Sequence, residues 1–280
     1  MWINAFGDCC VDRYRDIGRQ FPGGGSLNVA LHLARLGATT RWIGRLGNDD
    51  NAEIVARAFV EPRLDTSRVQ RVNGETTVVD VDLVDGERTF TGWVEGVGLG
   101  VELTDEDLRF LFADADLVHT AWSAEFSTQP VPWCSGGAGL SVDFVKDQFA
   151  DARPVLETVP VTVATFSRTS EDQPKLDRLI ADVHSLGVPW VLVGMGESGA
   201  VVSHRGARCF QPAESIEVVD TLGAGDSFIA AALTEIVKGS EPPTVARVAS
   251  QYAARTCLSY GGGAEGLPLT DVNEPRPTER

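Results

Sequence analysis

Short apolar runs alternate, along most of the chain, with segments in which apolar residues recur every three or four positions. The first pattern is typical of strands buried in a parallel sheet, and the second of helices that cover such a sheet. The predicted strands include residues 2–6, 41–46, 117–121, 140–144, 161–164 and 189–193. The predicted helices include residues 28–36, 171–186, 227–237 and 244–258, and a further helix starts at Thr104. The alternation predicts an α/β fold built on a mostly parallel sheet.

One segment, residues 76–94, departs from this alternation. Apolar and polar residues alternate singly from Val79 to Val84, and a second β-rich run follows the Asp85-Gly86 turn. This pattern predicts a β-hairpin. Because an isolated hairpin is only marginally stable, we expect it to pair with the β-rich segment 11–18 in a small accessory sheet. The pattern leaves two roles open for this sheet, a lid over a site or an extra edge of the main sheet.

Length and composition favour one large domain. Of the 280 residues, 43% are apolar and 23% are charged, as in ordinary globular proteins. A chain of this length buries one large core and has room for a small appendage. We therefore expect a single domain over residues 1–268. The charged, proline-containing segment 269–280 is expected to be a disordered tail.

Charge and cysteine usage argue against several classes of partner and site. The formal net charge of −16 repels a nucleic-acid backbone. No apolar run approaches the ~20 residues of a membrane span and no basic leader is present, so we expect a cytoplasmic protein. The five cysteines are an odd set without C-x-x-C spacing. They indicate neither a disulfide framework nor a zinc site.

The string of residues 220–226 carries the strongest chemical signal. Small residues at positions 223–225 let consecutive backbone N–H groups point at an anion from the start of a helix. Asp226 follows at once, where a nucleophilic hydroxyl would have to lose its proton. The string therefore indicates a phosphoryl-transfer site. The alternative is a glycine-rich turn that caps an ordinary helix, which requires only one glycine and a capping residue.

Three polar residues near the N-terminus are candidates for binding hydroxyl groups. Asp8 and Asp12 bracket the end of the first strand, and Asn28 follows the glycine run 23–25 at a helix start. Carboxylate and amide groups fit the donors and acceptors of a diol, and glycine lets a sugar approach the main chain. Taken singly, these residues fit a capped helix and a solvated strand end. Together with Asp226 they favour a polyol pocket.

Gly194, Gly196 and Gly199 formally fit the dinucleotide-binding pattern G-x-G-x-x-G after an apolar strand. That site needs a helix next, whereas residues 200–203 are typical of a strand. The glycines are therefore interpreted as a hairpin turn. Such a turn can leave room for an adenine ring or be purely structural.

Two motifs carry a family resemblance. Residues 23–30, with Leu36-Gly37 and residues 44–49, resemble the N-terminal signature of the ribokinase-like (PfkB) carbohydrate kinases. Residues 220–226 resemble the C-terminal signature of that family, and the resemblance covers residues 1–268. It implies a three-layer α/β/α sandwich with a small β-sheet lid. It also implies ATP as phosphoryl donor and a sugar hydroxyl as acceptor.

Carried over by position, the resemblance assigns a role to each matching residue. Asp226 would be the catalytic base, with the N–H groups of Gly223, Ala224 and Gly225 as the anion hole. The sugar would be held by Asp12, Gly24, Gly25 and Asn28, and the nucleotide site would include Gly194, Gly196, Gly199 and Glu171. A monovalent cation such as K⁺ would lie near Asp220 and the Leu222 carbonyl, and Mg²⁺ would bridge the ATP phosphates, largely through water.

The chain departs from the family pattern at two places in the nucleotide site. The family often has an Asn-x-x-Glu segment after the strand 161–164, and of this pair only Glu171 is present here. Gly194 replaces a threonine that is common in the nucleotide turn, which removes a hydroxyl group. These differences bear on the binding of the donor and leave the reaction type unchanged.

Within the family, residues 7–14, 94–97 and 116–119 resemble the bacterial fructoselysine 6-kinases. A substrate of that class carries an ammonium group, which Glu95 suits by charge. The other kinases considered are a fructokinase, a 2-keto-3-deoxygluconate kinase and a nucleoside kinase. A sugar-binding regulator without catalysis is the alternative from another class. Because lid sheets can pair between subunits, the sequence leaves a homodimer open.

Overall fold

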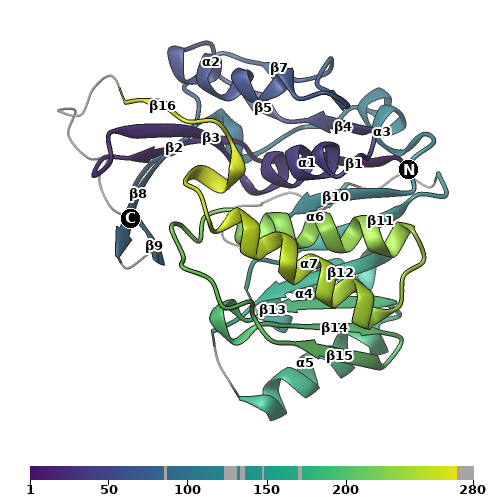
Figure 1. Ribbon diagram of the computed structural model, residues 1–280. Coiled ribbons are helices and arrows are strands. Elements are labelled where there is room, and N and C mark those ends of the chain that lie inside the picture. Colours follow the sequence, from purple (N-terminus) through teal and green to yellow (C-terminus); the bar gives the residue numbers. More distant parts are fainter. Residues whose placement is uncertain (85–86, 123–130, 133–135, 147, 170–171, 270–280) are drawn as a thin grey trace.

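The computed structural model describes residues 1–84, 87–122, 131–132, 136–146, 148–169 and 172–269. A nine-stranded sheet forms its centre, in the order β15-β14-β13-β12-β11-β10-β1-β4-β6 (Figure 1). The neighbours from β6 to β13 are parallel, and β14 and β15 are antiparallel additions at one edge. The strands are β1 (Ile3–Phe6), β4 (Thr40–Ile43), β6 (Leu64–Asp65), β10 (Leu117–Ala121), β11 (Gly139–Asp143), β12 (Val161–Ser167), β13 (Trp190–Gly194), β14 (Ala200–His204) and β15 (Ala207–Gln211).

Helices cover both faces of the large sheet, so the predicted α/β sandwich is confirmed. On one face α1, α6 and α7 share an apolar core with β1, β13 and β14 (Figure 1). On the other face α3, α4 and α5 share a second core with β10, β11 and β12. The helices are α1 (Gly25–Arg35), α2 (Asp50–Ala56), α3 (Asp105–Phe112), α4 (Phe149–Thr158), α5 (Gln173–Ser185), α6 (Ala224–Val237) and α7 (Pro242–Thr256). Strands buried on both faces must be apolar throughout, which explains the continuous apolar runs of the sequence.

A second, five-stranded sheet stands beside the large one in the order β16-β3-β2-β8-β9 (Figure 1). The predicted hairpin forms its strands β8 and β9, and β8 pairs with β2 as expected. The segment predicted at 11–18 is shorter, because β2 ends at Tyr14 and the chain turns back as β3. The strands are β2 (Cys10–Tyr14), β3 (Arg19–Gly23), β8 (Val78–Val84), β9 (Glu87–Val94) and β16 (Leu267–Pro268).

Strand β3 was not predicted, because Pro22 and Gly23 are unfavourable inside a strand. The structure shows why they are tolerated. On one side Pro22 pairs with Val11 of β2. On the other side β16 reaches only Arg19 and Gln20, so Pro22 lies at a sheet edge where its missing N–H costs no hydrogen bond.

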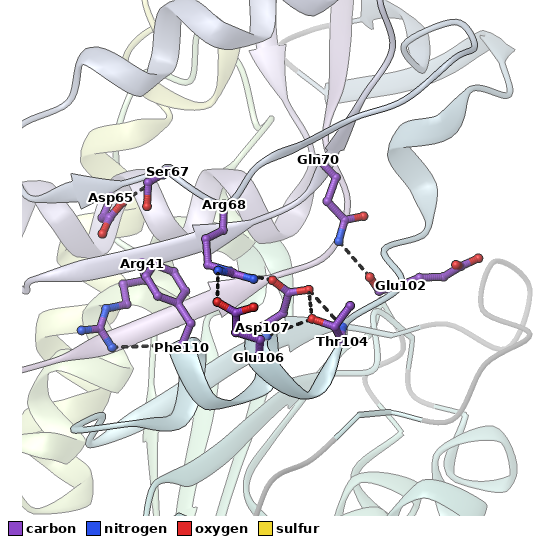
Figure 2. Close-up of polar contacts among 10 residues, drawn as sticks. All are labelled: Arg41, Asp65, Ser67, Arg68, Gln70, Glu102, Thr104, Glu106, Asp107 and Phe110. Carbon is purple, nitrogen blue, oxygen red and sulfur yellow. Dashed lines mark hydrogen bonds and ion pairs between the residues drawn. The ribbon is translucent and has the colours of Figure 1, made fainter.

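Helix α3 starts where the sequence predicted, and Figure 2 shows how its start is fixed. The hydroxyl group of Thr104 accepts the backbone N–H of Asp107, and the Asp107 carboxylate accepts the backbone N–H of Thr104 in return. Arg68 approaches the same turn and bonds Asp107 at 2.7 Å and Glu106 at 2.9 Å (Figure 2). Acidic groups in a first helical turn are stabilised by the N–H groups exposed there.

Helix α1 begins at Gly25, three residues before the predicted start. The carboxylate of Asp8, at the end of β1, accepts the N–H groups of Gly25 at 2.7 Å and Ser26 at 2.9 Å. Asp8 therefore caps a helix that is distant in sequence, which explains the early start. Asp8 thus has a structural role, and its interpretation as a hydroxyl-binding residue stays a prediction. No helix in the described ranges is both long and apolar enough to cross a membrane.

Candidate active site

The start of helix α6 has the geometry of an anion-binding site. Gly223 is in the left-handed region (φ +73°), and no side chain caps the helix. The N–H of Ala224 closes a turn on the Thr221 carbonyl at 3.2 Å. The N–H groups of Gly225 and Asp226 have no acceptor among the residues described. The Gly223 N–H likewise has no acceptor there, so an anion at this point would meet the amides of 223, 225 and 226, while the Ala224 N–H of the expected 223–225 set is engaged in the turn.

Helices α1 and α6 begin side by side, and their first turns meet at Asp226. The Asp226 carboxylate accepts the side-chain N–H of Asn28 at 2.9 Å. A Cβ atom placed on Gly25 would lie 3.7 Å from the other Asp226 oxygen, so the glycine leaves this side of the carboxylate open. The amide oxygen of Asn28 is buried and accepts no hydrogen bond from a described residue. It is available to a hydroxyl donor beside the candidate base.

The pKa of Asp226 suits a base at neutral pH. Burial raises this pKa from 3.8 to about 6, against the opposing hydrogen bond from Asn28 and the charge of Arg88, while Asp8 adds to the rise. At pH 7 the carboxylate is therefore ionised but more basic than an exposed aspartate.

Asp12 of strand β2 lies in the same electrostatic environment. Its pKa is raised to about 7, mainly by burial; a hydrogen bond from Cys10 and the charge of Arg88 lower it, and Asp226 adds to the rise. The side chain is wedged against Gly23, where a Cβ atom would lie 1.9 Å from an Asp12 oxygen. Asp12 is thus held in place by the glycine run that leads into α1.

Gly24 and Glu95 are connected to this region through Cys9. Gly24 has φ +106°, and a Cβ atom on it would lie 2.4 Å from Cys9 Cα, so the packing of the chain alone requires glycine. The N–H of Cys9 donates to the Gly98 carbonyl at 3.0 Å. Gly98, which follows β9, is thereby connected through Cys9 to the glycine run. Glu95, three residues before Gly98, is exposed.

The glycines 194–199 form a hairpin turn between β13 and β14, as predicted, and no helix follows them. Gly199 has a structural cause, because a Cβ atom there would lie 2.2 Å from the Gln211 carbonyl oxygen. Cβ atoms on Gly194 and Gly196 would meet nothing within 4 Å. These two positions leave open space at the carboxyl end of β13. Glu171 lies outside the described residues.

Asp220 is fully buried and surrounded by hydrogen-bond donors. One oxygen accepts the Tyr14 hydroxyl at 2.6 Å and the Gly261 N–H at 2.9 Å, and the other accepts the Leu222 N–H at 2.9 Å. The Leu222 carbonyl accepts no hydrogen bond from the part of the chain that the structure describes. Of the two expected ligands of a monovalent cation, the carboxylate is thus already engaged by the protein.

Three residues at the site were missed by the sequence analysis. Tyr14 bonds Asp220, and Arg88 of β9 donates to the Thr221 carbonyl at 3.2 Å. Asp143 ends β11, and its pKa is raised to about 7 by burial, with Asp226 and Asp8 adding to the rise against a hydrogen bond from a backbone N–H. Asp143 was detectable, because ligands of parallel sheets bind at the carboxyl ends of strands. Nothing in the sequence indicated the contacts of Tyr14 and Arg88.

The family follows from a direct match. The model of the pfkB family carbohydrate kinases matches residues 13–131 and 162–269, which include both motifs, Asn28 and Asp226. The chain belongs to this family. This membership agrees with the geometry of the site. The start of α6 has no side-chain cap, and the Asp226 carboxylate, with its raised pKa, contacts the side-chain amide of Asn28.

Individual pfkB relatives are similar over nearly the whole chain. A fructosamine kinase of Bacillus subtilis is 31% identical over 96% of this chain and 95% of the relative. A fructoselysine 6-kinase of Escherichia coli is 30% identical over 92% of this chain and 98% of the relative. A Vibrio cholerae fructokinase, solved with fructose, ADP and potassium ion, has a TM-score of 0.72 at 19% identity, covering 97% of this chain and 95% of that one.

The packing of the anion-binding turn is testable by stability measurements. Gly223→Ala places a Cβ atom 2.5 Å from Gly262 Cα in a left-handed residue. We expect a loss of about 2 kcal/mol or more in the free energy of unfolding, measured by urea denaturation. Gly225→Ala is the matched control, because its Cβ atom meets nothing within 4 Å. Equal stability of the two variants would contradict the described turn.

The raised pKa of Asp226 also predicts a pH-dependent stability. The fold favours the protonated carboxyl, so this contribution is complete below the unfolded pKa of 3.8 and is lost as the pH rises through about 6. Asp226→Asn removes the loss. We expect the variant to be more stable than the parent at pH 8, by up to about 3 kcal/mol, and by less at pH 5. Thermal unfolding at both pH values measures the difference, and a less stable variant at pH 8 would refute the assignment.

Proposed function

We propose that this protein is an ATP-dependent kinase that phosphorylates a primary hydroxyl of a ketose, and that its substrate is a fructosamine such as fructoselysine, phosphorylated at the 6-position. The reaction class rests on membership of the pfkB family. The observation that carries the assignment to a site is the contact of Asn28 with Asp226 at 2.9 Å, beside the uncapped start of α6.

In the proposed reaction the terminal phosphate of ATP binds at the start of α6. The N–H groups of Gly225 and Asp226 stabilise charge on the transferring phosphoryl group. The Asp226 carboxylate accepts the proton of the sugar hydroxyl, and Asn28 holds the carboxylate with one end of its amide. The free oxygen of that amide accepts a neighbouring sugar hydroxyl. Asp12, Gly24 and Gly25 complete the sugar site, and Gly194 and Gly196 leave room for the nucleotide.

Mg²⁺ supplies charge neutralisation on the phosphates in this class of reaction. Among the described residues, no group of three or more His, Cys, Asp and Glu side chains is arranged to hold a metal ion. A site built from the nucleotide phosphates, water and at most one or two carboxylates fits this composition. Asp143 is one candidate, since the charge of Asp226 contributes to the rise of its pKa and it ends a strand at the ligand edge.

The small sheet is proposed to serve as a lid within a single domain of residues 1–268. Its strand β2 carries Asp12, and its strand β9 brings Arg88 to the 220–226 turn. A sheet that contributes to the sugar site and contacts the phosphate-binding turn is suited to exclude water, which would limit hydrolysis of ATP. Pairing of such sheets in a homodimer is part of the same proposal.

The choice of a fructosamine rests on the relatives and on Glu95. The Bacillus subtilis and Escherichia coli relatives described above are named fructosamine kinase and fructoselysine 6-kinase. Glu95 is exposed and precedes by three residues Gly98, whose carbonyl accepts the Cys9 N–H next to the glycine run. Its carboxylate suits the ammonium group of an amine-bearing ketose, while plain fructose offers it no charge.

The reaction is tested by an ADP-release screen over ketoses, fructosamines, keto-deoxy acids and nucleosides. We expect turnover with a fructosamine, and a loss of about 10²–10⁴ in kcat for Asp226→Asn. The kcat should rise as the pH increases through about 6, because Asp226 must be ionised to accept the proton. Turnover of nucleosides alone would overturn the substrate class, and an unimpaired Asp226→Asn would overturn the role of the base.

The role of Glu95 is tested with two substrates. Exposed ion pairs contribute up to about 1 kcal/mol, so Glu95→Gln should raise KM for fructoselysine about fivefold. The KM for fructose should stay unchanged, and Glu95→Asp should retain most of the preference. An equal change in KM for both substrates would show that Glu95 does not bind the ammonium group.

A further inference from the structure

The buried carboxylate of Asp220 needs compensation that the protein itself provides. An ionised group that is removed from water is stable only when it is paired or well hydrogen-bonded. Asp220 is 0% exposed and accepts three hydrogen bonds, from Tyr14, Leu222 and Gly261. The shortest, at 2.6 Å, comes from Tyr14 and has the length of a strong charge-assisted O–H···O⁻ bond.

Tyr14 is fixed in this position by its surroundings. It is 1% exposed and packs edge-on against Phe21 at 5.3 Å and Tyr260 at 6.2 Å between ring centres. A cation at the same carboxylate oxygen would have to displace a phenol group that packing holds in place.

A positive charge reaches the same turn from the small sheet. Arg88 donates through Nη1 to the Thr221 carbonyl at 3.2 Å, and its backbone N–H lies 3.4 Å from the Thr221 hydroxyl oxygen. Its charge also lowers the pKa of Asp226 and Asp12. Tyr14 and Arg88 thus bring a fixed dipole and a fixed charge to consecutive residues of the turn, from strands β2 and β9.

The Asp220 oxygen that accepts the Tyr14 hydroxyl and the Gly261 N–H is therefore closed to a resident monovalent cation. We propose that the Tyr14 hydroxyl, supported by Arg88, takes the place of the cation in shaping the 220–226 turn, so that the kinase works without K⁺. Tyr14 is a positioning residue, since it touches Asp220 and not the reacting groups. This inference rests on the proposed function, and it distinguishes this chain from relatives that use the cation.

The experiment compares rates in KCl and in N-methylglucamine chloride at equal ionic strength, with ATP and the substrate found by the screen. The parent protein should show less than a twofold difference. Tyr14→Phe keeps the ring and removes the donor, which frees the Asp220 oxygen for a cation beside the Leu222 carbonyl. Its kcat should fall at least tenfold without K⁺ and recover in KCl. The proposal would be overturned if KCl raised the rate of the parent protein more than tenfold, or if the rate of Tyr14→Phe were the same with and without K⁺.

Tyr252→Phe is the matched control, because it removes a hydroxyl that contacts His32 at 3.1 Å and not Asp220. It should show no response to K⁺. If Tyr14→Phe does not fold, the parent protein decides alone, because a parent rate that rises more than tenfold in KCl would refute the proposal and an unchanged rate would support it.

A second readout does not depend on turnover. The melting temperature of the nucleotide-free protein should be the same in the two salts for the parent and should rise in KCl for Tyr14→Phe. Failure of the proposed kinase activity would leave this measurement intact. A K⁺-dependent melting temperature of the parent would refute the inference about Tyr14 by itself.

Discussion

The contact between Asn28 and Asp226 is the constraint on which the site depends. It requires two helices that start at opposite parts of the sequence to begin at one point of the sheet edge. Asp8, which follows β1, caps the start of α1. The start of α6, in contrast, has no side-chain cap. The division is chemically useful, because one helix start is satisfied within the protein and the other retains N–H groups for an anion.

The small sheet is connected to the same turn through two polar contacts. Tyr14 of β2 bonds Asp220, and Arg88 of β9 bonds Thr221. Displacement of the sheet would leave the Asp220 carboxylate buried with one donor fewer, which is costly in a dry environment. The geometry of the 220–226 turn is therefore coupled to the position of the sheet that carries Asp12. The proposed sugar site and the proposed anion site are parts of one connected structure.

Periodicity in the sequence predicted the elements of the large sheet well. The strand expected at 140–144 occupies Gly139–Asp143, and the helix expected at 244–258 occupies Pro242–Thr256. These elements are defined by burial, which apolar spacing records. The pattern did not predict strand β3, because the strand tolerates Pro22 only where β16 no longer pairs with it. The pattern did not predict the hydrogen bond from Tyr14 to Asp220, because these residues are 206 positions apart and no local pattern encodes the packing that brings them together.

Three carboxyl groups of the site, Asp12, Asp143 and Asp226, have pKa values raised mainly by burial, and the charge of Asp226 adds to the rise at the other two. In a protein with a net charge of −16, such a cluster repels an incoming polyphosphate. The short-range N–H groups of α6 and the charge of Arg88 oppose this repulsion at the proposed position of the phosphoryl group. Burial, with a smaller contribution from the charge of Asp8, raises the proton affinity of Asp226, which strengthens it as a base. The acidic groups of the proposed site thus weaken the binding of the nucleotide, while the raised pKa of Asp226 favours removal of the proton from the sugar hydroxyl. A divalent cation on the nucleotide phosphates would reduce the repulsion and strengthen nucleotide binding.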